Sequence, residues 1–79
     1  MFEVGYLFRL GDVLHLSTSK HLILRAKAIP LIGTAAYDED LKKVGIVIEV
    51  FGPVKQPYLS VKPSVSKPDS YVGKMLYSL

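Results

Sequence analysis

The eight-residue segment 51–58, which reads Phe-Gly-Pro-Val-Lys-Gln-Pro-Tyr, restricts what this chain can form more than any other feature. Its prolines exclude a helix because proline lacks a donor N–H and restricts the residue before it. With the glycine, they also exclude a simple tight hairpin. Alternating apolar residues flank the segment on both sides, as in strands. We therefore predict a rigid, extended connection whose apolar groups either fold back over the core or face a partner.

The segment before this connection has the clearest strand pattern in the chain. Residues 43–50 alternate with a period of two, and the predicted core face is Val44, Ile46, Ile48 and Val50. Gly45 lies on the opposite face. A glycine inside a strand indicates a bulge, a sharp bend or the close approach of another backbone.

The strand pattern on either side of the connection predicts the orientation of its two aromatic residues, Phe51 and Tyr58. Leu59 and Val61 alternate with polar residues, which places both in the core and Tyr58 on the outside. By the same phase, Phe51 falls on the face opposite Val50. The pattern therefore predicts that the two aromatic side chains are not both core residues.

Short apolar segments separated by glycine, proline and polar turns recur along the chain. Residues 12–17 and 21–26 are expected to pair as an antiparallel hairpin, with the second strand covered on both faces. Further strands are expected at 34–37 and 74–78, and no helix of normal length is predicted. Five or six short strands in one small domain indicate an all-β fold, a closed or nearly closed barrel without exposed edges.

A chain of 79 residues forms one small domain. We expect residues 9–79 to form the barrel and residues 1–8 to form an N-terminal arm or an extra strand. The sequence has no cysteine, which excludes disulfides and thiolate metal sites. The apolar opening segment is too short for a membrane span and lacks the basic start of a signal peptide.

Residues suited to catalysis or metal binding are sparse. The contiguous acidic residues 38–40 are interpreted as a solvated turn because they supply no convergent cage for a cation. His15 and His21 are two ligands where zinc normally takes three or four. No serine has a recognisable histidine and carboxylate pairing, and no nucleotide-binding glycine motif occurs. We therefore expect no catalytic residue, no metal and no cofactor.

Three interpretations of residues 51–58 remain open from these patterns. The loop plugs one end of its own barrel, or it docks on a protein, because stiff aromatic and proline-rich loops bind with little ordering cost. In the third, Tyr58 stacks on single-stranded nucleic acid between Lys55 and Lys62. The net charge of +3, concentrated in the second half of the chain, is compatible with nearby nucleic acid or with surface lysines that solubilise strands.

The longer stretch 47–63, V-I-E-V-F-G-P-V-K-Q-P-Y-L-S-V-K-P, resembles the core motif of a known protein family. That family is the small non-catalytic subunit of archaeal box H/ACA RNA-guided pseudouridine synthases. Residues 9–15, 22–25, 43–45 and 71–77 agree with it in order and spacing, so the resemblance covers about residues 9–77. The glycine–arginine-rich tails of the eukaryotic relatives are missing, which indicates an archaeal-type protein.

The resemblance implies a six-stranded β-barrel like the second domain of translation elongation factors. It implies that the chain docks on the catalytic subunit of the pseudouridine synthase and assists substrate RNA loading and product release in rRNA pseudouridylation. Other H/ACA subunits and the guide and substrate RNA would be reached mostly indirectly. An archaeal-type protein would be cytoplasmic, a eukaryotic one nucleolar, and no membrane partner is expected.

The resemblance and the strand phase together select the candidate site residues. The predicted partner-facing residues are Phe51, Pro53, Val54, Pro57 and Tyr58, with Gly45 permitting close backbone approach. The candidate RNA-proximal residues are Lys55, Lys62 and Lys67. The alternative function is a small barrel that binds single-stranded nucleic acid directly.

Overall fold

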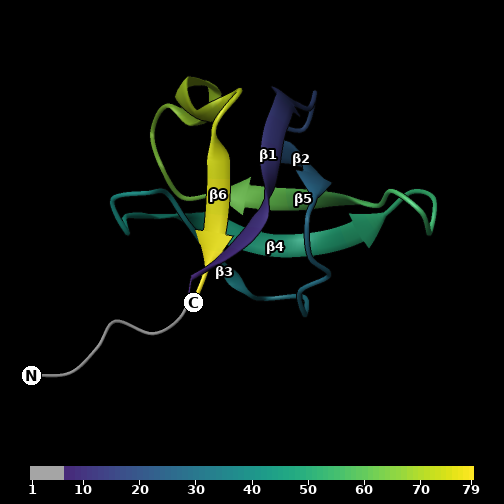
Figure 1. Ribbon diagram of the computed structural model, residues 1–79. Helices are drawn as coiled ribbons and strands as arrows, with labels where there is room; N and C mark the ends of the chain where they lie inside the picture. The colour runs from purple at the N-terminus through teal and green to yellow at the C-terminus, as the bar shows by residue number, and fades with distance from the viewer. Residues whose placement is uncertain (1–6) are drawn as a thin grey trace, which may run out of the picture.

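Six antiparallel strands close into a barrel in the computed structural model, which describes residues 7–79 (Figure 1). The strands are β1 (Phe8–Leu16), β2 (Leu22–Ala26), β3 (Ala35–Tyr37), β4 (Lys43–Phe51), β5 (Tyr58–Pro63) and β6 (Met75–Ser78). Their order around the barrel is β1-β2-β5-β4-β3-β6. The predicted all-β barrel is confirmed. The expected N-terminal arm lies almost entirely outside the described residues, and its last position, Phe8, begins β1.

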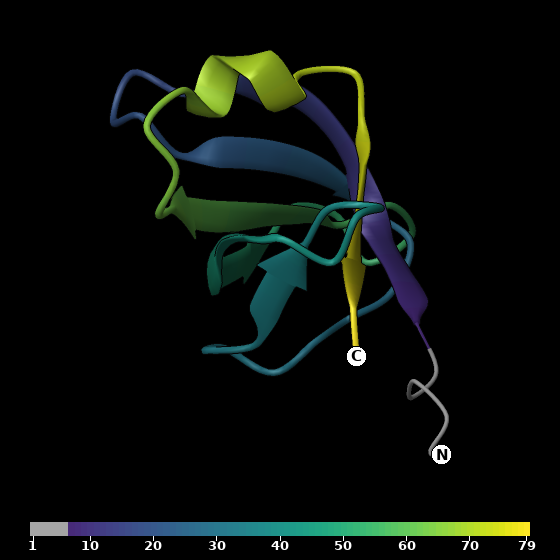
Figure 2. The same ribbon diagram turned by 90° about the vertical axis from the view of Figure 1, so that its left-hand side faces the viewer.

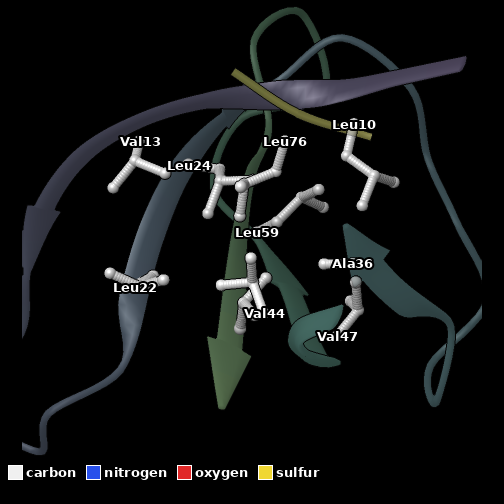
Figure 3. Packing of buried hydrophobic residues seen from close by; sticks show 10 residues of the cluster. Leu10, Val13, Leu22, Leu24, Ala36, Val44, Val47, Leu59 and Leu76 are labelled. Carbon is white, nitrogen blue, oxygen red and sulfur yellow. The ribbon is translucent and has the colours of Figure 1, made fainter. Parts of the chain in front are cut away.

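The barrel interior is filled by aliphatic side chains from every strand (Figure 3). Ten of them are buried: Leu10, Val13, Leu22, Leu24, Ala36, Val44, Val47, Leu59, Val61 and Leu76. Such a core fills a small barrel completely and leaves the outer faces of the strands for turns and partners.

Strand β5 follows the alternation that its sequence predicts, and β2 alternates as well. Leu59 and Val61 of β5 are fully buried, and Tyr58 lies outside the core. In β2, Leu22 and Leu24 are fully buried. The expectation that β2 is covered on both faces is wrong, because Ile23 is only half-buried on the outer side of the barrel.

Strand β4 departs from its predicted phase because it contains an irregularity. Its register against β5 shifts between Val47 and Glu49. A bulge inserts one residue and moves the following side chains to the other face. This shift returns Val50 to the core side after Val47. A second shift, against β3, lies between the pairs Ala36–Gly45 and Tyr37–Lys43 and changes the phase between Val44 and Val47. Val44 and Val47 are therefore fully buried, while Ile46 and Ile48 of the predicted core face are half-buried.

Gly45 is the point at which β5 approaches β4 most closely. A Cβ atom at this position would lie 2.2 Å from the carbonyl oxygen of Lys62 and 2.9 Å from the Cα of Pro63. Of the three explanations left open for this glycine, the close approach of another backbone is correct. That backbone belongs to this chain, and Gly45 is buried in the barrel wall where β4 pairs with β5.

The only helical segment within residues 7–79 is the 3₁₀ turn η1 (Pro68–Tyr71), which lies across one end of the barrel (Figure 2). In this described part of the chain, no helix is long and apolar enough to cross a membrane.

Replacing Gly45 with alanine is expected to lower the free energy of unfolding by about 2 kcal/mol or more, because the new methyl group forces β4 and β5 apart. Gly73→Ala is the matched control: Gly73 has φ +88° but nothing within 4 Å of its Cβ position. Its backbone strain alone is expected to cost about 1 kcal/mol. Urea denaturation measures both values. An alanine at position 45 that costs no more than one at position 73 would contradict this account of barrel closure.

Candidate protein-docking loop

The β4–β5 loop (residues 52–57) projects beyond the barrel wall as the end of a long hairpin (Figure 1). The two strands remain paired up to Phe51 opposite Tyr58. Within the loop, the N–H of Gln56 donates a hydrogen bond to the carbonyl oxygen of Pro53 at 3.1 Å, which closes a turn at the tip. The predicted rigid connection is thus a six-residue loop on a continuous β-ladder.

The base of the loop is held by two aromatic rings. The ring centroids of Phe51 and Tyr58 are 5.8 Å apart, with 33° between the planes. Gly52 has φ +94°, a conformation that disfavours other residues. A Cβ at Gly52 would lie 2.8 Å from the Tyr58 ring, so the glycine also makes room for this ring. As the strand phase predicted, the two aromatic residues are not both in the core, because Phe51 is 38% exposed.

Hydrogen bonds attach the loop to the end of β2. The N–H of Ala26 donates to the carbonyl oxygen of Pro57 at 3.1 Å. The Gln56 side-chain amide donates to the carbonyl oxygens of Pro57 at 3.0 Å and of Ala26 at 3.4 Å. With two prolines in the loop, these bonds leave it little freedom to lose when a partner binds.

The tip of the loop faces away from the core. Val54 is 98% exposed, and Pro53 and Lys55 beside it are also exposed. The interpretation that the loop plugs the barrel is therefore wrong. An apolar side chain of this size that a rigid loop holds in water is typical of binding surfaces. Its burial by a partner is favourable because apolar area is then removed from water.

The predicted partner-facing residues of positions 51–58 lie together on this one hairpin end. Phe51, Pro53 and Val54 are exposed, and Pro57 and Tyr58 are half-buried at its base. Gly45, as described above, lies elsewhere in the barrel wall.

The candidate RNA-proximal lysines do not gather in one place. Lys55 is on the loop, whereas Lys62 pairs with Ile46 near the start of β4. Four positions of strand separate Tyr58 from Lys62, about 13 Å at roughly 3.3 Å per residue. Lys67 precedes η1. All three are exposed, but they do not form a single basic groove around Tyr58.

The acidic turn at 38–40 is organised by one of its carboxylates. Asp38 accepts hydrogen bonds from the N–H groups of Asp40 and Lys42, each at 2.9 Å, and from the Tyr71 hydroxyl at 2.8 Å. Glu39 and Asp40 remain exposed. Asp38 thus ties the β3–β4 turn to η1, a link between residues distant in sequence that the sequence analysis did not predict.

These contacts shift the pKa values of both partners. Partial desolvation opposes ionisation of Asp38, but the hydrogen bonds from Lys42, Tyr71 and Asp40 and the charge of Lys42 outweigh it and lower the pKa of Asp38 from 3.8. The hydrogen bond to Asp38, together with burial and the nearby carboxylates, raises the pKa of Tyr71 above 10.0.

The two histidines are not directly opposite one another. His15 pairs with Ile23 in the β1–β2 ladder, while His21 lies beyond the end of β2 and its carbonyl accepts from Ser17. Within residues 7–79, no group of three or more histidine, aspartate or glutamate residues is placed to hold a metal ion.

A second exposed apolar segment was missed by the sequence analysis. Between β2 and β3, Ile29, Leu31 and Ile32 are all exposed. Pro30 and Gly33 interrupt any strand or helix period in this segment. A run of large apolar residues without either strand or helix periodicity was the available signal.

The chain is similar to known proteins in sequence and in fold. A family model described as "Gar1/Naf1 RNA binding region" matches residues 7–78. An uncharacterized protein of Methanothermobacter thermautotrophicus is 35% identical over 72 residues, which cover 86% of this chain and 78% of that protein. An uncharacterized protein of Methanocaldococcus jannaschii is 36% identical over 52 residues, or 66% of this chain and 63% of that protein.

A solved structure described as the Gar1 domain of Naf1 has the same fold. It matches with a TM-score of 0.74 and 24% identity, covering 99% of this chain and 88% of the solved one.

Replacing Tyr71 with phenylalanine is expected to lower the free energy of unfolding by about 1 kcal/mol at neutral pH, because it removes a hydrogen bond to a partly solvated carboxylate. The lowered pKa of Asp38 stabilises the fold above 3.8, and this contribution is lost as the pH falls through the folded-state value. The difference in free energy of unfolding between wild type and the Tyr71→Phe variant should therefore become smaller in acid. It should also narrow as the pH rises through the raised pKa of Tyr71.

Chemical denaturation across this pH range measures the difference. Tyr77→Phe is the matched control, since no hydrogen bond of the Tyr77 hydroxyl is found among residues 7–79. A stability difference at position 71 that stays constant from acid to neutral pH would show that Asp38 is not the partner that matters.

Proposed function

This chain belongs to the Gar1/Naf1 RNA-binding family, and from that premise we propose that it is a non-catalytic subunit of an H/ACA ribonucleoprotein. In this proposal it docks on the pseudouridine synthase subunit and assists substrate RNA loading and product release in rRNA pseudouridylation. The family is one of H/ACA-associated RNA-binding accessory domains and is not a known catalytic family. We further propose that the protein is cytoplasmic and of the archaeal type.

The observation that carries the docking proposal is the position of Val54. The side chain is 98% exposed at the tip of a loop whose base is fixed by an aromatic pair and by hydrogen bonds to β2. A preformed apolar projection of this kind binds a partner with little ordering cost. The proposed role follows: the chain supplies a rigid surface, and the reaction takes place on its partner.

Replacing Val54 with aspartate is expected to weaken binding to the purified synthase subunit about 30-fold, equivalent to about 2 kcal/mol for a central apolar contact. The melting temperature should stay within about 2 °C of wild type, because a fully exposed side chain contributes little to the fold. Isothermal titration calorimetry and a thermal melt measure the two quantities.

Val72→Asp is the matched control, since Val72 is an exposed valine beside η1 rather than on the loop. It should bind like wild type. Equal affinity of the Val54→Asp variant and wild type would place the interface elsewhere on the barrel.

A second candidate function, direct binding of single-stranded RNA, is favoured by the description of the family as an RNA-binding region. In that case Tyr58 stacks on a base and Lys55 and Lys62 contact the phosphates. The packing of the Tyr58 ring against Phe51 and Gly52, and the position of Lys62 at the other end of β5, weigh against it.

A filter-binding titration of the isolated chain with single-stranded RNA separates the two functions. We expect weak binding by the chain alone. Tight binding that falls steeply with salt would favour the RNA function, because phosphate contacts release counterions.

A further inference from the structure

The crossing between β2 and β3 (residues 27–34) carries the most exposed large apolar side chains of residues 7–79 outside the β4–β5 loop. Leu31 is 83% exposed and Ile29 is 63% exposed, with Ile32 exposed between Leu31 and Gly33. None of these three belongs to the barrel core. The proposed docking role, which rests on the β4–β5 loop, does not use them.

The crossing is fixed at both ends by hydrogen bonds to the barrel. The N–H of Lys27 donates to the carbonyl oxygen of Leu10, and the N–H of Gly33 donates to that of Val47, both at 2.7 Å. Thr34 donates twice to the carbonyl oxygen of Leu31, from its hydroxyl at 2.6 Å and from its N–H at 3.1 Å. Leu31 is therefore presented on an ordered turn, as Val54 is.

The two exposed segments are joined by a continuous surface. A shallow groove runs between the crossing and the β4–β5 loop, and Ala28, Ile29, Val54 and Pro57 contribute to its lining. A second, mostly apolar groove on the other side of the crossing is lined by Phe8, Ile29 and Leu31 among others. Ile29 belongs to both grooves and connects them.

The size of a typical stable interface can be compared with the size of these two exposed segments. A standard interface takes roughly 20–30 residues and about 800 Å² from each partner. The six residues of the β4–β5 loop are too few to provide it. Resting on the proposed function, we propose that the β2–β3 crossing, with Ile29 and Leu31, is the second half of the surface that docks on the synthase subunit.

The residues lining the two grooves also indicate the chemistry of the surface that they meet. The side chains are mainly aliphatic, Lys27 and Lys55 lie at the edge, and no acidic side chain takes part. Aliphatic groups gain by burial against other apolar groups but do not stack on bases as aromatic rings do. The partner surface is therefore an apolar depression with carboxylates at its rim, which favours a protein over a nucleic acid.

The test compares single substitutions in the full chain for binding to the purified synthase subunit by surface plasmon resonance. Leu31→Asp is expected to weaken binding at least about tenfold, mainly through faster dissociation. Val54→Asp serves as the positive control and Val72→Asp as the negative control. The double neutralisation Lys27→Gln with Lys55→Gln should slow association and reduce its dependence on salt, because it removes the attraction between these lysines and the partner's carboxylates.

The outcomes separate this inference from the proposed function. If wild type does not bind the synthase subunit, both are wrong. If Val54→Asp weakens binding while Leu31→Asp binds like wild type, the docking function stands and the second half of the surface is wrong.

Three further measurements on the Leu31→Asp variant identify other occupants of the crossing. A wild-type dimer that becomes monomeric in sedimentation would show that a second copy covers it. A melting temperature lowered well below that of wild type would show that the chain's own residues cover it. Loss of RNA affinity without loss of synthase affinity would assign it to RNA. Each of these results overturns the inference.

Discussion

The pairing of β4 with β5 is the constraint on which both the barrel and its proposed docking surface depend. This ladder runs from Gly45 opposite Pro63 to Phe51 opposite Tyr58. At the first end, the missing side chain of Gly45 lets β5 approach closely enough for the barrel to close. At the other end, the same two strands extend past the barrel and carry the β4–β5 loop. The loop is stiff because it continues a ladder that the core already stabilises.

This arrangement explains how a domain without a helical framework presents apolar groups to water in a fixed position. Closure of the barrel removes free strand edges among residues 7–79. Among residues 7–79, the most exposed large apolar side chains are on two ordered connections, the β4–β5 loop and the β2–β3 crossing. Hydrogen bonds through Ala26 and Gly33 fix these connections to the strands. This arrangement fits the proposed roles, in which this chain provides a rigid docking surface and its partner carries out the reaction.

Local patterns in the sequence predicted the features that depend on neighbouring residues. Leu59 and Val61 face the core because β5 is regular, and the loop residues lie together because they are contiguous. The predicted phase of β4 failed at its register shifts against β3 and β5, because the regular alternation of apolar residues does not reveal a bulge. The bond between Asp38 and Tyr71 joins residues 33 positions apart, and only the closed barrel brings them together. The exposed β2–β3 crossing was missed for the same reason, because its burial depends on what packs over it.

The most direct test of the central claim is cross-saturation NMR on the methyl-labelled chain bound to the synthase subunit, because saturation passes only between groups in contact. The account predicts strong saturation transfer from the partner to the methyl groups of Val54, with Val72 beside η1 unaffected. Transfer concentrated at Val72 and at Leu41 of the β3–β4 turn, with none at Val54, would contradict the assignment of the β4–β5 loop as the docking surface.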